Sequence, residues 1–343
     1  MAKEFIRRTI PTTKPRPDWW KVRPDEIMEI CQSARRLHLE TIATTPGGFP
    51  VYSLSMGQTS PHNRVNWPSA TGSKHPQVYA DNHPQVIMVV AGIHAEECEG
   101  ISTAVNLISL LETGKDLRGV ERPHLVELCE KYRLIILPCV NMDGRAIAPD
   151  CLMGCTQAEY GPIQTILDDG SVLKWPDLKE YFPMPMERVR QLGTYYNSDG
   201  YNIMLDCAPG NIQTAEASAI LKLADQERID FFLNMHSCSY CSHVIVPNVM
   251  NYPGNVRTIL ELRRKWRAKW GQPEDTPPPG TLQSDIDVAV TLATGAATMT
   301  FEMDALTVEP FDTKIEYGYT ILETIMEHGL EQHLCDRATI LKQ

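Results

Sequence analysis

The chain has 343 residues, of which 43% are hydrophobic and 22% are charged. This length and composition are those of a globular protein with a sizeable core, and they exclude a disordered chain, a collagen-like repeat and a coiled coil. The 43 acidic residues outnumber the 32 basic residues, and the resulting net charge of −11 disfavours nucleic acid and anionic membranes as partners.

The N-terminal sequence MAKEFIRRTIPTTKPRPDWW contains charge and proline but no apolar signal core. No apolar run in the sequence approaches the roughly 20 residues that a membrane-spanning helix needs. We therefore expect a cytoplasmic protein without a membrane partner. Its ten cysteines are then expected to be free thiols or metal ligands rather than disulfides.

An irregular, proline-rich arm comes first in the predicted order of elements. Residues 24–42 have the apolar spacing of a helix, and residues 47–57 have the pattern of a strand punctuated by glycine. We expect residues 1–44 to form an arm and a helix that pack on a single catalytic domain, which spans residues 45–343.

Four later segments are short apolar runs that end in polar residues, and runs of this kind are typical of strands buried on both faces. They are QVIMVVAGIHAEE at 85–97, YRLIILPCVNMDG at 132–144, IDFFLNMHS at 229–237 and ATMTFEMD at 297–304. Helices are predicted between them over residues 96–114, 214–228 and 255–271. Gly114 is expected to cap the first of these helices, and Asn255 and Gly271 to begin and end the last.

This alternation predicts an α/β fold with a mixed, mostly parallel central sheet and helices on both faces. Ligands bind beyond the carboxyl ends of the strands in such sheets, where His94, Asn141–Asp143, His236 and Glu302 fall. Two segments are expected to be irregular, namely a long insertion at about 145–199 and a proline-rich loop at 272–280. Each is either a lid over the site or surface decoration.

The chemistry-bearing residues include an H-x-x-E pair, His94 and Glu97, at the junction of a predicted strand and helix. Imidazole and carboxylate both bind zinc, and His236 would complete the three protein ligands that a catalytic zinc ion takes. Glu302, flanked by apolar residues, is costly to bury without a role, and it could accept a proton from a zinc-bound water. Each residue also has a simpler interpretation. His94 and Glu97 would be a solvated surface pair, His236 a histidine packed in the core, and Glu302 a buried glutamate paired with arginine or lysine.

A second metal site is conceivable in the run HSCSYCSH at 236–243, where Cys238 and Cys241 lie between two histidines. This run is compact for a closed structural site, and such a site would leave Glu97 and Glu302 unexplained. A further close pair, Cys151 and Cys155, is expected to pack in the core, with redox sensitivity as the alternative.

Taken together, these motifs resemble the zinc carboxypeptidases of the funnelin type over about residues 45–330. GIHAEE at 92–97 matches the family's H-x-x-E motif, and NMDG at 141–144 matches its N-P-D-G turn. MHS at 235–237 matches its third-ligand segment, and TFE at 300–302 matches its T-x-E segment. The resemblance implies one zinc ion per chain on His94, Glu97 and His236, with Glu302 as the catalytic base.

The sequence also departs from the family. In GYNIML at 200–205, Met204 and Leu205 stand where the peptidases have an Asn-Arg pair that binds the terminal carboxylate of the substrate. There is no tyrosine in the 30 residues before Glu302, where the family usually has one, whereas TAEA at 214–217 keeps the family's glutamate. Arg145 is the nearest candidate for binding substrate, with Arg188 and Arg190 as others.

The sequence therefore predicts a zinc-dependent enzyme that hydrolyses a peptide or a small amide substrate, with a divergent carboxypeptidase-like peptidase as the first choice. An amidase or deacylase of the same fold is the second choice, because the carboxylate-binding pair is replaced. An inactive homologue that binds a ligand in the old cleft is the third.

Overall fold

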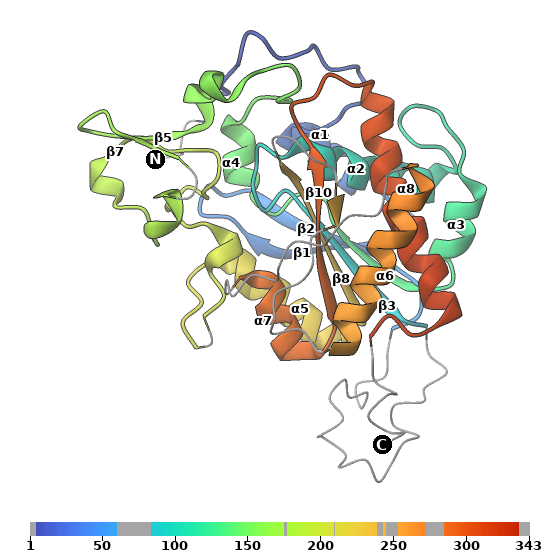
Figure 1. Ribbon diagram of the computed structural model, residues 1–343. Coiled ribbons are helices and arrows are strands. Elements are labelled where there is room, and N and C mark those ends of the chain that lie inside the picture. Colours follow the sequence, from blue (N-terminus) through green and yellow to red (C-terminus); the bar gives the residue numbers. More distant parts are fainter. Residues whose placement is uncertain are drawn as a thin grey trace.

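A seven-stranded sheet runs through the centre of the computed structural model (Figure 1). The structure describes residues 5–59, 84–174, 177–208, 210–238, 243–244, 253–271 and 285–335. The strands are, in their order across the sheet, β1 (His38–Thr44), β2 (Pro50–Met56), β4 (Arg133–Leu137), β3 (Val86–Ala91), β8 (Phe231–Cys238), β10 (Ala297–Asp304) and β9 (His243–Val244). The inner strands β4, β3, β8 and β10 are parallel, whereas β1, β2 and β9 run antiparallel to their neighbours.

Helices cover both faces of this sheet (Figure 1). One face carries α1 (Pro24–Ser33), α2 (Cys98–Thr113), α3 (Pro123–Cys129), α6 (Pro253–Lys269) and α8 (Phe311–Glu331). The other face carries α5 (Ala215–Glu227) and α7 (Ile286–Thr294), and the short α4 (Met142–Ile147) follows β4. The predicted mixed sheet with helices on both faces is therefore confirmed.

Strand β3 shows why the sequence forms a sheet buried on both sides. Ile87, Val89 and Ala91 pack into the core under α2 and α8, whereas Val86, Met88 and Val90 pack into the core under α5 and α7. All six side chains are fully buried. A strand with two covered faces needs a continuous apolar run, which is the pattern that predicted β3, β4, β8 and β10.

The prediction of one helix over residues 24–42 is wrong in its second half. Helix α1 ends at Ser33, and His38–Thr44 forms β1, which pairs antiparallel with β2. The sequence HLETIAT is rich in β-branched residues, which favour a strand. Because this strand lies at the edge of the sheet and is largely exposed, it lacks the alternation of apolar and polar residues by which a strand is recognised. At α6, Asn255 lies inside the helix rather than at its cap, and its side-chain amide donates to the carbonyl of Gly295 (3.2 Å).

The insertion at 145–199 is less irregular than expected. It contains a small sheet of β5 (Thr165–Leu167), β6 (Val172–Leu173) and β7 (Val189–Gln191), which lies to the left of the central sheet in Figure 1. Short 3-10 helices join these strands and the segment after them, at η3 (Gln157–Glu159), η4 (Gly161–Ile163), η5 (Asp177–Glu180), η6 (Met186–Arg188) and η7 (Ile203–Leu205). The insertion has a small core of its own. The proline-rich loop at 272–280 lies outside the described residues.

The N-terminal arm is bound to the start of this insertion through Asp150. The carboxylate of Asp150 accepts from Arg7 (2.7 Å), from Arg16 (3.1 Å) and from Arg23 (2.6 Å), and its carbonyl accepts from the fully buried indole of Trp20 (3.1 Å). The arm is therefore part of the folded body. The division at residue 44 into an arm and one catalytic domain stays a prediction.

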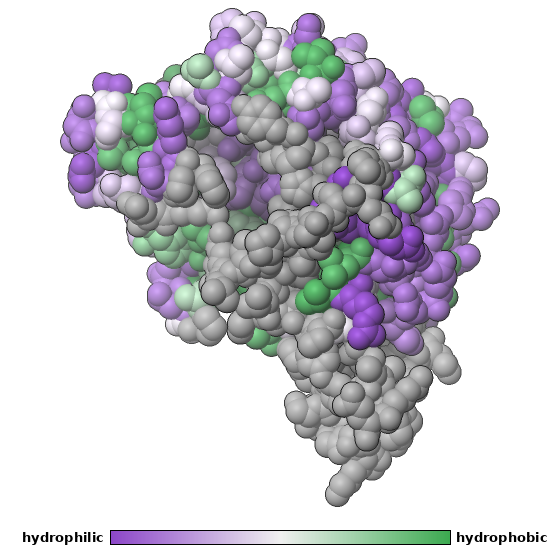
Figure 2. Space-filling model, in the orientation of Figure 1, coloured by the Kyte–Doolittle hydropathy of each residue, from purple (hydrophilic) through white to green (hydrophobic). Residues whose placement is uncertain are grey.

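The surface of the described residues is polar where the helices face outward. Figure 2 shows a mainly hydrophilic surface on the right of the view, over α3, α6 and α8. Within the described segments, no helix has the length and apolarity to cross a membrane. The cysteines whose side chains are described, including Cys151 and Cys155, are all buried free thiols, as expected.

Candidate active site

The first two site residues come from the turn between β3 and α2. Gly92 has a φ of +63°, and a Cβ atom there would approach the side chains of Cys139 and Ile101 to 2.9 Å, so glycine permits the chain to turn. His94 follows in this turn, and Glu97 occupies the N-cap position of α2. The Nδ1 atom of His94 lies 2.9 Å from Oε1 of Glu97.

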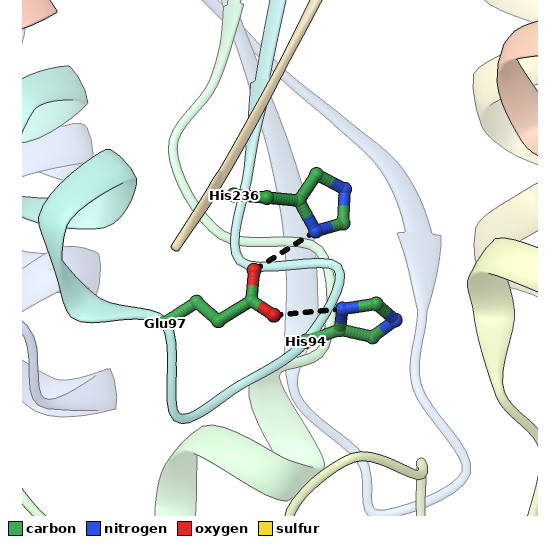
Figure 3. A group of neighbouring side chains, drawn as sticks. All are labelled: His94, Glu97 and His236. Carbon is green, nitrogen blue, oxygen red and sulfur yellow. Dashed lines mark hydrogen bonds and ion pairs between the residues drawn. The ribbon is translucent and has the colours of Figure 1, made fainter. Parts of the chain in front are cut away.

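The third residue, His236, comes from the carboxyl end of β8. Its Nδ1 atom lies 2.8 Å from Oε2 of Glu97, so the carboxylate sits between two imidazoles (Figure 3). The same oxygen accepts from the backbone N–H of Ser237 (3.0 Å). All three side chains are buried, and their potential ligand atoms lie within 4.8 Å of one another. Two imidazoles and one carboxylate are a donor set that zinc takes in catalytic sites, so this group fits a zinc ion.

Burial and charge have opposite effects within this group. Burial alone would raise the pKa of Glu97, but the charges and hydrogen bonds of His236 and His94 lower it. Burial alone would likewise lower the pKa of His236, but the carboxylate of Glu97 raises it. The buried carboxylate therefore favours a positive charge between the three side chains, which is the charge that a metal cation would supply.

Glu302 joins the group through the register of the sheet. In the parallel pairing of β8 with β10, Glu302 lies opposite His236, so both side chains point to the same face. The alternate residues of both strands, such as Met235 and Phe301, enter the core on the other face. Glu302 and His236 line the same cavity, and the charge of Glu302 adds to that of Glu97 in raising the pKa of His236. The structure thus brings together the four residues that the sequence singled out.

These residues line a cavity of about 590 Å³. Its charged lining is mostly acidic, because Glu96 and Asp285 join Glu97 and Glu302 there. Among the described residues, Lys174 is the one lysine or arginine that lines it. Its apolar and aromatic lining includes Leu152, Tyr160, Ile163, Leu173, Leu178, Tyr195, Tyr196, Met204, Leu205 and Ala305.

The insertion supplies two contacts to the site that the sequence analysis missed. The ring of Tyr195 stacks on the imidazole of His94, with centroids 3.6 Å apart and planes 16° apart. The hydroxyl of the preceding Thr194 donates to Glu96 (3.0 Å). Burial, followed by the charges of Glu97, Glu96 and Glu302, raises the pKa of Tyr195 well above 10. Glu96 lies within the H-x-x-E motif and could have been found there, whereas no sequence pattern marks Tyr195.

The structure does not place Arg145 in the cavity, contrary to the prediction that it binds substrate. Its side chain is fully buried beside α4. The guanidinium donates to the carbonyls of Ala95 (2.5 Å), Ala148 (2.9 Å) and Pro149, which leaves it engaged in holding backbone. Arg188 ends η6 and Arg190 lies on β7; both residues are exposed, and neither lines the cavity.

The NMDG turn has a structural role next to the site. Asn141 caps α4 by accepting from the backbone N–H of Gly144 (2.9 Å). The buried carboxylate of Asp143 accepts from Thr45, from the N–H of Gly47 (2.9 Å) and from the N–H of Ser198 (3.0 Å). This turn therefore links the β1–β2 connection, at Thr45 and Gly47, to Ser198 near the end of the insertion.

Glu216, the glutamate kept in TAEA, is fully buried beside this junction. It accepts from the side chain of Asn197 (3.2 Å), and burial, with added repulsion from Asp143 and Asp199, raises its pKa to about 7. We expect Glu216→Gln to stabilise the protein at pH 8 by about 3 kcal/mol and to have little effect below pH 4.5. Between those values the unfolded chain loses its proton first, so the free energy of unfolding of the unsubstituted protein falls as the pH rises.

Urea unfolding from pH 4 to pH 8 measures this effect. The exposed Glu121, which pairs with Lys115 at 3.2 Å, offers a matched control, since Glu121→Gln is expected to leave the pH profile unchanged. An equal free energy of unfolding for Glu216→Gln and the unsubstituted protein at pH 8 would contradict the prediction.

The competing site in HSCSYCSH receives no test from the structure. Residues 239–242 lie outside the described residues, and nothing is described of the side chains of Cys238 and His243. His236 belongs to the group with Glu97.

Met204 and Leu205, which stand where the peptidases have the Asn-Arg pair, both line the cavity together with Asn202.

Residues 29–276, well over half of the chain, match the family model described as zinc carboxypeptidase. The chain belongs to the zinc carboxypeptidase family. The match includes His94, Glu97 and His236 but ends before β10, so it does not extend to Glu302. No curated protein matches this family member in sequence.

Solved structures of metallo-carboxypeptidases share the fold of this family member. One from Burkholderia cenocepacia superposes with a TM-score of 0.57 at 13% identity, covering 89% of this chain and 68% of that one. One from Pseudomonas aeruginosa, in complex with (2-guanidinoethylmercapto)succinic acid, has a TM-score of 0.53 at 14% identity, covering 90% and 68%. Carboxypeptidase A from Helicoverpa armigera has a TM-score of 0.51 at 16% identity, covering 92% and 74%. At these identities the likeness concerns the fold.

Proposed function

We propose that this member of the zinc carboxypeptidase family hydrolyses an amide or peptide bond, with one zinc ion per chain held by His94, Glu97 and His236. The observation that carries the proposal is the carboxylate of Glu97 held between two Nδ1 atoms at 2.9 and 2.8 Å in a buried group. When bound, zinc polarises a carbonyl and lowers the pKa of a water molecule toward neutrality.

Glu302 is the general base of this proposal. Its carboxylate would accept the proton of the attacking water and then donate that proton to the leaving amine. The position of Glu302 on a central strand, opposite His236, supports this role because the sheet fixes the distance between the two side chains. Its place in the wall of the same cavity gives it access to a substrate.

A second candidate, an amidase or deacylase, is favoured by the charge of the cavity. In the described residues no arginine lines it, and Met204 and Leu205 occupy the positions of the expected carboxylate-binding pair. Glu96 instead lines the cavity close to the metal group, and burial raises its pKa to about 7, so it offers a free C-terminal carboxylate no positive charge. An inactive ligand-binding homologue is disfavoured because it has no need to retain the metal group together with Glu302.

Paired peptides with free and with amidated C-termini test this proposal on the zinc-loaded protein, with Glu302→Gln as the blank. We expect hydrolysis that zinc chelation abolishes. Cleavage of the free-ended set alone would support a carboxypeptidase and contradict the amidase. Cleavage of both sets, or of simple N-acyl amides alone, would support the amidase. No hydrolysis of any of the three sets would contradict both enzymes and support the inactive homologue.

The expectations of a cytoplasmic location and of no nucleic-acid partner rest on the sequence composition and stay predictions.

A further inference from the structure

Tyr195 lines the cavity, and the residues before and after it in the chain are held by hydrogen bonds. The N–H of Gly193 donates to the hydroxyl oxygen of Thr165 (2.9 Å), and the N–H of Thr194 donates to the carbonyl of Ile163 (3.0 Å). A Cβ atom on Gly193 would lie 2.7 Å from that hydroxyl oxygen, so the close approach of the segment to β5 requires glycine. On the other side, Tyr196 donates its hydroxyl to the carbonyl of Leu178 (2.8 Å). The position of Tyr195 is therefore determined by its neighbours.

The ring of Tyr195 lines the same cavity as the metal group. At 3.6 Å and 16° it is nearly parallel to the imidazole of His94, and it also lines the cavity. Glu96, Glu97 and Glu302 line the same cavity, so a substrate bound there would lie between the Tyr195 ring and these carboxylates.

The hydroxyl of Tyr195 differs from the other hydroxyl groups around the metal group in what it contacts. Those of Thr194, Ser237, Thr300 and Tyr196 each donate to another protein group, namely Glu96, Glu99, Asp287 and the carbonyl of Leu178. The hydroxyl of Tyr195 donates to no group within the described residues. It is thus the hydroxyl beside His94 that remains available to a ligand.

We propose that Tyr195 is a catalytic residue whose hydroxyl donates a hydrogen bond to the carbonyl oxygen of the amide that this site hydrolyses. The inference rests on the proposed function. Negative charge develops on that oxygen as water adds to the carbonyl, and a fixed donor stabilises it more in the transition state than in the ground state. Ionised carboxylates, which are the main charged groups of the cavity wall, accept hydrogen bonds and cannot supply this contact, whereas the Tyr195 hydroxyl beside His94 can.

Tyr195→Phe tests the hydroxyl while it keeps the ring on His94. We expect kcat/KM to fall about 100-fold, the size of effect seen when one such donor is removed, with most of the loss in kcat. The zinc content and the thermal unfolding midpoint should not change. Tyr52→Phe is the matched control. Tyr52 lies on β2, away from the cavity, where its hydroxyl accepts from the side chain of Gln32 in α1 (2.8 Å), and its removal should leave kcat/KM unchanged.

A binding measurement gives a readout that does not need turnover. Titration of the Co²⁺-loaded protein with acetohydroxamate, followed by visible absorption, reports a carbonyl-bearing probe at the metal group. Tyr195→Phe is expected to weaken the probe about 10-fold, the value of one hydrogen bond, without weakening Co²⁺ binding. Tyr195→Leu, which also removes the ring, is expected to weaken the probe at least as much.

The outcomes separate this inference from the proposed function. Equal kcat/KM and equal acetohydroxamate affinity in Tyr195→Phe and the unsubstituted protein would overturn the role of Tyr195 while leaving the hydrolase in place. An unsubstituted protein that neither binds Co²⁺ nor hydrolyses an amide would overturn the proposed function, and the role of Tyr195 with it.

Discussion

Replacing Glu302 by glutamine is expected to lower kcat/KM for amide hydrolysis by about 10³-fold, within the 10²- to 10⁴-fold range of general acid–base catalysis. Glutamine keeps the shape of the side chain but cannot accept the proton of the attacking water. Because Glu302 is not one of the three clustered ligand residues, the zinc content should stay at one ion per chain. Steady-state kinetics with metal analysis of the same sample measure both quantities.

A carboxylate far from the cavity provides the control for this substitution. Glu323 is half-buried on α8, on the opposite face of the sheet, and Glu323→Gln should retain full activity. Full activity of Glu302→Gln would show that another group takes the proton. Loss of zinc together with activity would instead assign Glu302 a role in metal binding, and either result contradicts the mechanism.

The part of this site that the sequence predicts is the part fixed by the central sheet. The strands that carry His236 and Glu302 are continuous apolar runs, since both of their faces are covered. Once such runs are recognised as parallel strands, their carboxyl ends must meet at one edge of the sheet. His94, His236 and Glu302 could therefore be grouped although more than 200 residues separate the first from the last.

The parts that were missed depend on contacts between distant and irregular segments. Tyr195 stacks on His94 because a three-stranded sheet and Gly193 position its segment, and nothing local in the sequence encodes that meeting. Arg145 was misjudged because adjacency to the NMDG turn does not determine the direction of a side chain. In α4 that side chain turns inward and binds carbonyl groups. Strand β1 was missed because an exposed edge strand lacks a continuous apolar run.

Replacing Glu97 by glutamine is expected to weaken zinc binding by more than about 100-fold, because even the groups that merely orient ligands contribute 10- to 100-fold. In the folded protein the carboxylate of Glu97 contacts both imidazoles and accepts from the N–H of Ser237, so this one group joins the β3–α2 turn to the end of β8. Glutamine keeps the size of this side chain but loses the negative charge that favours a cation and one of the two acceptor oxygens. Hydrolysis should be lost with the metal at ordinary zinc concentrations.

The neighbouring Glu96 makes this prediction specific, since it is a carboxylate one position away that belongs to the cavity wall but not to the metal group. Glu96→Gln should therefore bind zinc with nearly the affinity of the unsubstituted protein, whatever it does to the choice of substrate. Competition with a chelating dye measures both affinities. A ligand that binds only the folded state at 1,000 times its Kd adds about 4 kcal/mol to the free energy of unfolding, so zinc should raise the thermal midpoint of Glu96→Gln and not that of Glu97→Gln. Equal stabilisation of the two variants by zinc would contradict the assignment of Glu97 as a ligand and would require a different metal site in this chain.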